Sequence, residues 1–172
     1  MSDPRFEKAV VLLAEASDDG ALGFVINRET PYTFADLKSD IGFDLTPRVE
    51  RTSVHYGGPV SPERGWVLFS GEDALDNEHV LTISPNLHIA ATLEVLGDFV
   101  TERVRDPFRL MLGYAGWEPK QLEEELQAGS WLPLELDQEL IFDVPLEDRW
   151  SIALKRLGVP PELFISGGGG DA

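Results

Sequence analysis

Three histidines, His55, His79 and His88, are the residues of this chain whose chemistry best suits metal binding or proton transfer. They lack the HxH or HExxH spacing that brings imidazoles onto one metal ion, so we predict no metal site and no cofactor. Each is expected at the surface or at a helix end. His88 falls near the start of a predicted helix, where the helix dipole favours a neutral imidazole that can act as a hydrogen-bond partner. His88 is therefore a candidate ligand-binding residue.

Asn27 and Arg28 form a second candidate site, at the end of a predicted strand, where side chains can leave the sheet and reach a ligand. The guanidinium of Arg28 could bind a carboxylate or a phosphate through two parallel hydrogen bonds. The alternative is an ion pair with one of the 31 acidic residues of the chain.

Two adjacent glycines, Gly57 and Gly58, stand directly before Pro59. Without side chains they permit a close backbone approach, either by a ligand or by a neighbouring strand. We favour the neighbouring strand and keep both glycines as candidates.

The segment GYAGW, from Gly113 to Trp117, has two interpretations. Tyr114 and Trp117 could form a shelf for a ligand. Alternatively, Trp117 packs on Leu122 as a hydrophobic staple at the start of a helix over 119–128, and the small residues let the chain swing from strand to helix. We favour the structural interpretation, because the local rules agree with one another.

Several classes of chemistry are excluded by what the chain lacks. It has no cysteine, hence no disulfide, thiolate metal site or cysteine nucleophile. It has no GxSxG nucleophile elbow, no GxGxxG dinucleotide fingerprint and no phosphate-binding loop. One enzymatic hypothesis remains, a hydrolase that uses Arg28 and His88 with a nearby carboxylate in a cleft.

The charge of the chain is strongly negative, −17 from 31 acidic and 14 basic residues. Residues 118–149 hold ten acids and two bases, a local net of −8. This stretch is either a solvated face or a docking surface for a basic partner. The densest basic cluster, Arg103, Arg105 and Arg109, is interrupted by Asp106, so we predict no direct binding of nucleic acid.

Hydrophobic patterning predicts one α+β domain over 1–166 with a mostly antiparallel sheet, followed by a flexible glycine-rich tail at 167–172. A hairpin is predicted from strands 9–16 and 21–29, joined by the turn SDDG. Further strands are predicted at 52–60, 65–71, 79–84, 108–115, 130–136 and 139–144. Helices are predicted at 33–41, from Asn86 to about residue 105, at 119–128 and from Pro145 to Leu157. No apolar run is long enough to span a membrane, and the charged N-terminus favours a cytoplasmic protein.

The motifs GYAGWEPKQLEEELQAGSWL, GALGFVINR, GGPV and IFDVPLEDRWSIALKRLG occur in this order over nearly the whole chain. Together they resemble the AlgH/YqgE family of bacterial proteins. The resemblance implies an α+β domain with a bent, bifurcated sheet that forms a pseudo-barrel with flanking helices. The family carries a transcriptional-regulator label without an established activity.

The resemblance also sets expectations from the positions where this chain departs from the family. Family histidines are replaced by Ala16 and Phe69, and a family proline by Glu29, so acid–base or metal chemistry is unavailable at Ala16 and Phe69. Family members have a further strand ahead of residues 3–6. We therefore expect the first hairpin to expose an edge, leading either to a homodimer through that edge or to a native start upstream of Met1.

These observations favour a non-enzymatic cytoplasmic binding or regulatory protein that acts through a protein partner or a small ligand. A hydrolase is the first alternative. A direct DNA-binding regulator is the second, and the net charge disfavours it.

Overall fold

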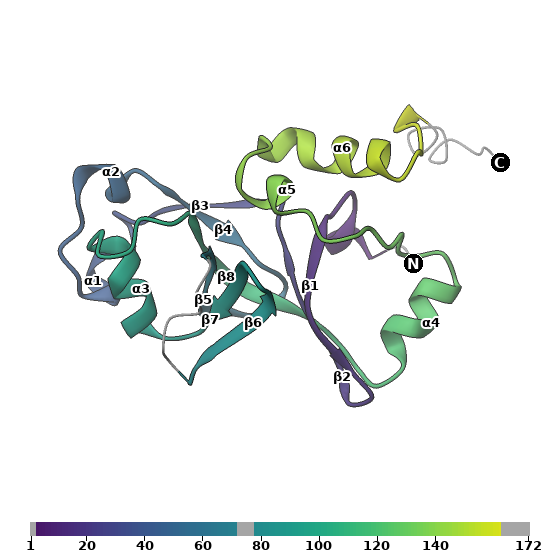
Figure 1. The fold of residues 1–172 in the computed structure, drawn as a ribbon, viewed down its shortest axis with the longest axis horizontal. Coiled ribbons are helices and arrows are strands. Elements are labelled where there is room, and N and C mark those ends of the chain that lie inside the picture. Colours follow the sequence, from purple (N-terminus) through teal and green to yellow (C-terminus); the bar gives the residue numbers. More distant parts are fainter. Residues whose placement is uncertain (1–2, 72–77, 163–172) are drawn as a thin grey trace.

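The computed structural model describes residues 3–71 and 78–162, which form a single α+β domain (Figure 1). The predicted tail at 167–172 lies outside the described residues. Within them, eight strands form one sheet: β1 Val11–Ser17, β2 Gly20–Val25, β3 Glu29–Thr33, β4 Ser53–Tyr56, β5 Val60–Ser70, β6 Val80–Ser84, β7 Leu87–Ala90 and β8 Phe108–Trp117. The helices are α1 Lys38–Ile41, α2 Pro47–Glu50, α3 Leu93–Val100, α4 Gln121–Gln127, α5 Gln138–Phe142 and α6 Arg149–Arg156, with 3-10 turns η1 Pro4–Phe6 and η2 Leu146–Asp148.

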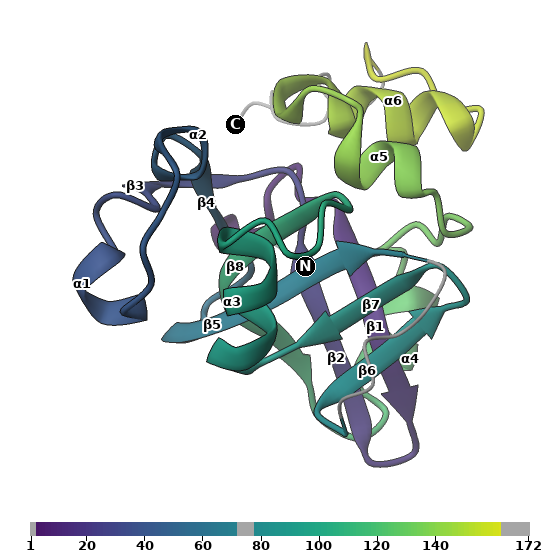
Figure 2. The same ribbon diagram turned by 60° about the vertical axis from the view of Figure 1, so that its left-hand side comes forward.

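The sheet follows the order β1-β2-β8-β5-β7-β6, and β3 pairs with β4 beside it. All pairings are antiparallel except the short parallel one between β4 and β8. Leu12 and Phe24 from one end of the sheet pack in the same cluster as Leu68 and Ile89 from the other end. The sheet therefore curls into a nearly closed barrel, as the turned view in Figure 2 shows, and the predicted bent antiparallel sheet is confirmed.

The sheet forks along β8. One edge of β8 pairs with β5, while the other edge pairs first with β4, at Met111 and Leu112, and then with β2, from Ala115 to Trp117. Gly57 joins the two branches: its N–H donates to the Leu112 carbonyl at 2.8 Å, and its carbonyl accepts from the Val25 N–H at 2.7 Å. This arrangement is the predicted bifurcation.

Glycine is required at the fork because two backbones touch there. A Cβ at Gly57 would overlap the carbonyl oxygen of Gly113, and a Cβ at Gly58 would overlap the peptide group of Tyr114. Gly113 itself has a φ of 73°, in the left-handed region, and its Cβ would overlap the Gly58 carbonyl oxygen. The favoured interpretation of Gly57 and Gly58, close approach by a neighbouring strand, is confirmed.

Three hydrophobic clusters hold the layers together. Helix α3 packs on the outer face of β5 and β8, where Phe69, Phe99 and Leu110 are almost fully buried. The barrel interior holds the second cluster, which Ile141 of α5 joins. The third cluster joins α5 to α6 through Leu140 and Ala153. The C-terminal segment thus packs against the barrel.

The hairpin and the strand within 108–115 are confirmed, with β8 running on to Trp117. The last predicted helix is confirmed from Arg149 to Arg156, whereas its first turn is the 3-10 turn η2. The helix predicted from Asn86 is wrong in its first turns: Leu87–Ala90 form β7, and α3 begins at Leu93 after the cap residue Thr92. All four residues of β7 are buried, so the strand lacks the alternation that would have identified it.

The two strands predicted at 130–136 and 139–144 are also wrong. Residues 131–137 have no regular structure, and Pro133 lacks the N–H that a ladder needs. Residues 138–142 form α5, because the Asp137 side chain accepts a hydrogen bond from the Glu139 N–H and caps the helix. In the part of the chain that is described, no helix is long and apolar enough to cross a membrane.

Gly113→Ala tests the fork, with Gly129→Ala as its matched control. Both glycines have nearly the same φ, 73° and 72°, but a Cβ at Gly129 would meet nothing within 4 Å. The left-handed backbone alone costs an alanine roughly 1–2 kcal/mol. We expect Gly129→Ala to lose that amount and Gly113→Ala at least about 3 kcal/mol, measured by urea unfolding. Equal losses would show that the crossing at the fork is not tight.

Candidate functional site

A cavity of about 680 Å³ lies beside the outer edge of β1. Its walls come from residues 6–13, from α4, from the segment 130–137 and from the inner faces of α5 and α6. Figure 1 shows why these parts meet: the chain between α4 and α5 runs back across β1. The volume falls within the range of pockets for small ligands, roughly 300–1,000 Å³.

The cavity gathers exposed apolar side chains. Among the described residues, seven large hydrophobic side chains are exposed, and four of them line this cavity: Leu13 at 42%, Leu126 at 37%, Leu132 at 46% and Leu136 at 45%. Contiguous exposed apolar surface on a single domain marks a binding site more often than chance exposure does. The cavity is therefore the strongest candidate site in the described structure.

Strand β1 contributes peptide groups to the cavity wall that have no partner strand among the described residues. Peptide groups of an antiparallel strand point alternately to its two sides. Those of Val10 face β2, because the Val10 carbonyl accepts from the Ile26 N–H at 2.9 Å. Val25, opposite Val11, donates its N–H away from β1, to Gly57. By this alternation the N–H and carbonyl groups of Val11 and Leu13 face away from β2, toward the cavity that these residues line.

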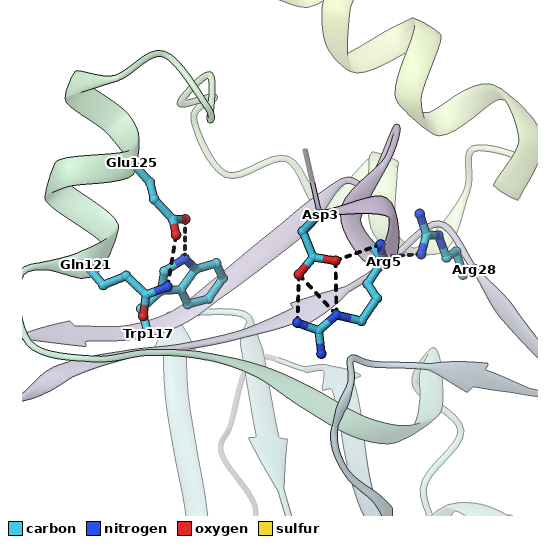
Figure 3. Close-up of polar contacts among 6 residues, drawn as sticks. All are labelled: Asp3, Arg5, Arg28, Trp117, Gln121 and Glu125. Carbon is cyan, nitrogen blue, oxygen red and sulfur yellow. Dashed lines mark hydrogen bonds and ion pairs between the residues drawn. The ribbon is translucent and has the colours of Figure 1, made fainter. Parts of the chain in front are cut away.

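The carboxylate of Glu125 connects the sheet to the part of the cavity wall that α4 and residues 130–137 form, which we call the roof of the cavity (Figure 3). Glu125 of α4 accepts hydrogen bonds from the indole N–H of Trp117 at 3.0 Å and from the Gln121 amide at 2.9 Å, as Figure 3 shows. It also accepts a hydrogen bond from the indole N–H of Trp131 at 2.7 Å. Burial raises the pKa of Glu125, but these three hydrogen bonds outweigh burial and lower it overall. The ionised carboxylate therefore holds α4 and residue 131 against the end of β8 at neutral pH.

Trp117 is thus an anchor, but not through the predicted staple. Helix α4 begins at Gln121 rather than at Pro119, after Lys120 in a left-handed conformation. Trp117 ends β8, is 7% exposed, and meets the ring of Trp131 edge to face at 5.9 Å. Trp117 also lines the cavity, and a contact between its side chain and a ligand stays a prediction.

Asn27 and Arg28 hold the N-terminal wall of the cavity. Asn27 accepts from the Val10 N–H and donates to the Lys8 carbonyl, both at 2.9 Å. The guanidinium of Arg28 donates to the carbonyl of Glu7 at 2.6 Å and to that of Arg5 (Figure 3). The predicted alternative, an ion pair with an acid, is not what the described structure shows. Both side chains position residues 5–10 rather than pointing to open solvent.

His88 lies in a separate network. The Nε2–H of His88 donates a hydrogen bond to the carbonyl of Gly71 at 3.2 Å. In the neutral ring Nδ1 then carries no proton, so it accepts a hydrogen bond from the Thr82 hydroxyl at 3.1 Å. The imidazole is 2% exposed and stacks on Phe69 within the sheet, not at a helix start. The described contacts therefore bring Arg28 and His88 into no common site, and nothing among them favours the hydrolase hypothesis.

Tyr114 faces the barrel interior, where its ring meets Trp66 at 5.9 Å. It belongs to a different surface from Trp117, which is three residues further along β8. The predicted shelf of Tyr114 and Trp117 is therefore not formed by the two together. A binding role for either side chain stays a prediction.

Sequence reasoning missed a basic cluster that consists of the buried residues His55 and Arg149 and the partly buried Arg109. Arg149 is 3% exposed and donates to the carbonyls of Val144, at 2.9 Å, and Ile26. Burial, and then the charge of Arg109, lower the pKa of Arg149 to about 10. Burial and the two arginines lower the pKa of His55 to about 4. No local spacing signals this cluster, because its members come from β4, β8 and α6.

Trp117→Ala tests the anchor. Replacing a buried tryptophan by alanine typically costs about 3–5 kcal/mol, and this variant also frees one acceptor site on Glu125. We expect a loss of that size in thermal or urea unfolding. An unchanged unfolding midpoint would show that Trp117 contributes to the cavity and not to the stability of the fold.

Comparison with known proteins gives a consistent assignment. The profile of the AlgH-like family matches residues 1–162. A UPF0301 protein of Anaeromyxobacter sp. (strain Fw109-5) is 45% identical over 177 residues, covering 99% of this chain and 89% of the relative. The UPF0301 protein of Myxococcus xanthus (strain DK1622) is 37% identical over 169 residues, 98% of this chain and 91% of the relative.

Two solved structures share the architecture. A crystal structure of a protein from Corynebacterium diphtheriae has a TM-score of 0.69 at 20% identity, covering 91% of this chain and 81% of that one, which shows a common fold alone. The solution structure of the AlgH protein from Pseudomonas aeruginosa has a TM-score of 0.80 at 35% identity, covering 100% of this chain and 90% of that one. The forked sheet, the motifs that position it and these likenesses agree, and the chain belongs to the AlgH-like family.

Proposed function

We propose that this chain is a non-enzymatic binding protein that takes an extended segment of a partner protein into the cavity beside β1. The segment adds a strand to the sheet at its open edge, with its backbone bonded to Val11 and Leu13. The main support for the proposal is that one cavity combines the outer edge of β1, which pairs with no other described strand, with four exposed apolar side chains.

A peptide fits this cavity better than a purely apolar small ligand does. An apolar ligand would cover the outward N–H and carbonyl groups of Val11 and Leu13 without giving them partners, and burying such groups unpaired costs roughly 1–3 kcal/mol each. An extended peptide supplies both kinds of partner at the strand spacing. Its alternate side chains can then pack on Leu132 and Leu136, which rise from the opposite wall.

Charge favours a basic partner. Residues 118–149, which include α4, the segment 130–137 and α5, carry a net −8. The lining of the cavity itself holds the carboxylates of Glu7, Glu135 and Asp137, and Lys8 is its basic residue. A partner segment with apolar residues at alternate positions and lysine or arginine at its ends would therefore be steered toward the cavity.

The binding test uses a synthetic peptide, Lys-Leu-Thr-Leu-Thr-Leu-Lys with both ends blocked. Three tryptophans, Trp117, Trp131 and Trp150, line the cavity and report binding through their fluorescence. We expect saturable binding of this peptide. The same peptide with proline in place of the central leucine should bind much more weakly, because it lacks one backbone donor and cannot pair fully with β1.

Leu132→Glu and Leu93→Glu make a matched pair for this test. Both leucines are exposed, at 46% and 56%, but only Leu132 lines the cavity, whereas Leu93 begins α3. We expect Leu132→Glu to weaken peptide binding about tenfold or more, which corresponds to about 1.4 kcal/mol, and Leu93→Glu to leave it unchanged. Equal effects of the two variants would contradict the proposed site.

Two results would assign the cavity to another occupant and overturn the proposal. One is binding of dodecanoate with no response to the peptide, which would indicate a small apolar ligand. The other is a homodimer in sedimentation that Leu132→Glu dissociates, which would make a second copy of the chain the occupant. The homodimer expected from the open edge is thus tested by the same variant.

We further propose that the chain works in the cytoplasm and does not itself bind duplex DNA. In the described structure Arg103 pairs with Asp98 at 3.6 Å and Arg109 donates to backbone carbonyls, so neither supports a basic stripe for phosphates. We expect no saturable binding in a low-salt fluorescence-anisotropy titration, the condition most favourable to electrostatic association. Salt-sensitive binding at micromolar protein would contradict this expectation.

A further inference from the structure

Arg149, which is buried, and Arg109, which is partly buried, have no ion pair in the described structure. Arg109 of β8 donates to the carbonyls of Phe108, at 2.8 Å, and Phe142, at 2.9 Å, and its guanidinium lies 5.4 Å from the ring of Phe142. Arg149 is likewise bound to backbone carbonyls. Within residues 3–71 and 78–162, neither guanidinium has a carboxylate oxygen within 4.0 Å.

Arginines at the surface of the protein differ from Arg109 and Arg149 in their partners. Exposed or half-exposed arginines such as Arg48, Arg103 and Arg156 do pair with acids. Burial strengthens an ion pair's attraction, and a buried charge left uncompensated is strongly unfavourable. Although the chain has 31 acidic residues, its buried Arg149 has no carboxylate within ion-pair distance among the described residues. Because Arg149 is buried, a bound counter-ion would stabilise it more than it would stabilise an exposed arginine.

His55 adds an unpartnered polar atom to the same place. It pairs with Met111 across β4 and β8, and Arg109 stands two residues before Met111 on β8. The side chains of His55, Met111 and Arg109 therefore share one face of the sheet. His55 is 5% exposed, and its buried Nδ1 has no hydrogen-bond partner among the described residues. Against the effect of burial, the backbone of Ser53 raises the pKa of the ring but supplies no hydrogen bond to Nδ1. Such an atom is rare in a native fold, and a bound group that forms a hydrogen bond with it is one explanation.

We infer that His55, Arg109 and Arg149 form a binding site for a small oxyanion, a carboxylate or a phosphate. The backbone carbonyls fix both guanidinium planes before binding, while Arg149 Nη2 and Arg109 Nε have no partner among the contacts described. Fixed guanidinium forks suit planar or tetrahedral oxyanions. In its Nδ1–H tautomer, His55 supplies a further donor.

Two carboxylates limit the charge that the site can take. Glu29 lies opposite His55 on β3, and both Glu29 and Asp143 act electrostatically on Arg109. Glu29 and Asp143 are exposed and Arg109 is only partly buried, so the site reaches solvent at that arginine. Their negative charges favour a singly charged anion over a doubly charged one.

Nuclear magnetic resonance of the histidine rings tests the site in the unaltered protein. The chain has three histidines, so each ring gives its own signal: His55 in the site, the buried His88 elsewhere and His79 as a third reference. The probes are acetate and phosphate, each titrated at neutral pH against chloride at matched ionic strength. We expect a saturable shift of the His55 signals and none of the His88 signals.

The two probes distinguish between the possible ligands of the site. A response to acetate alone identifies a carboxylate site, and a response to phosphate alone identifies a phosphate site. No shift of His55 beyond the chloride control, or equal shifts of the histidines, would overturn it.

Arg109→Gln, with the exposed Arg105→Gln as control, tests which cation binds. We expect Arg109→Gln to weaken anion binding about tenfold or more, with Arg105→Gln unchanged. Equal affinities in the two variants would contradict the assignment. Because the histidine titration uses the unaltered chain, the inference stays testable even where Arg109→Gln fails to fold.

Discussion

The contact between two backbones at the fork of the sheet determines the rest of this structure. Gly57 and Gly58 cross Gly113 so closely that no side chain fits at any of the three positions, and the peptide of Gly57 bonds to both branches of the sheet. Strand β8 can therefore pair with β4 and then with β2 along a single edge. Because β2 and β1 follow the second branch, β1 becomes the outer edge, and its far side is left for the C-terminal segment to cover.

That covering is apolar but incomplete. Residues 130–137 and helices α4 to α6 cross the outer edge of β1 without pairing with it, and Pro133 is one reason they cannot. The Glu125 carboxylate fastens this roof through Trp117 and Trp131, while Asn27 and Arg28 fasten the N-terminal wall. Edge strands are normally paired, covered or charged, since an open edge invites another strand. The cavity beside this edge is the place where we propose that a partner strand binds.

Much of this architecture could be predicted from local sequence rules. The hairpin, the close approach at Gly57 and Gly58 and the forked sheet follow from turn chemistry, glycine spacing and family motifs. Strand β7 could not, because burial on both faces removes alternation and a helical stripe through Ile89 competes with it. The cavity and the cluster of His55 with Arg109 and Arg149 could not either. Both join elements that only tertiary packing brings together, and Arg28 gave no local sign that its partners would be carbonyls rather than acids.

Amide hydrogen exchange in β1 measures the central claim most directly, because it reads the open edge residue by residue. In the free protein the Leu12 N–H should exchange slowly, as it faces β2, while those of Val11 and Leu13 should exchange fast. Adding the alternating leucine–threonine peptide should slow Val11 and Leu13 and leave Leu12 unchanged. Slow exchange of all three amides without peptide, or fast exchange of Val11 and Leu13 at saturating peptide, would contradict the account.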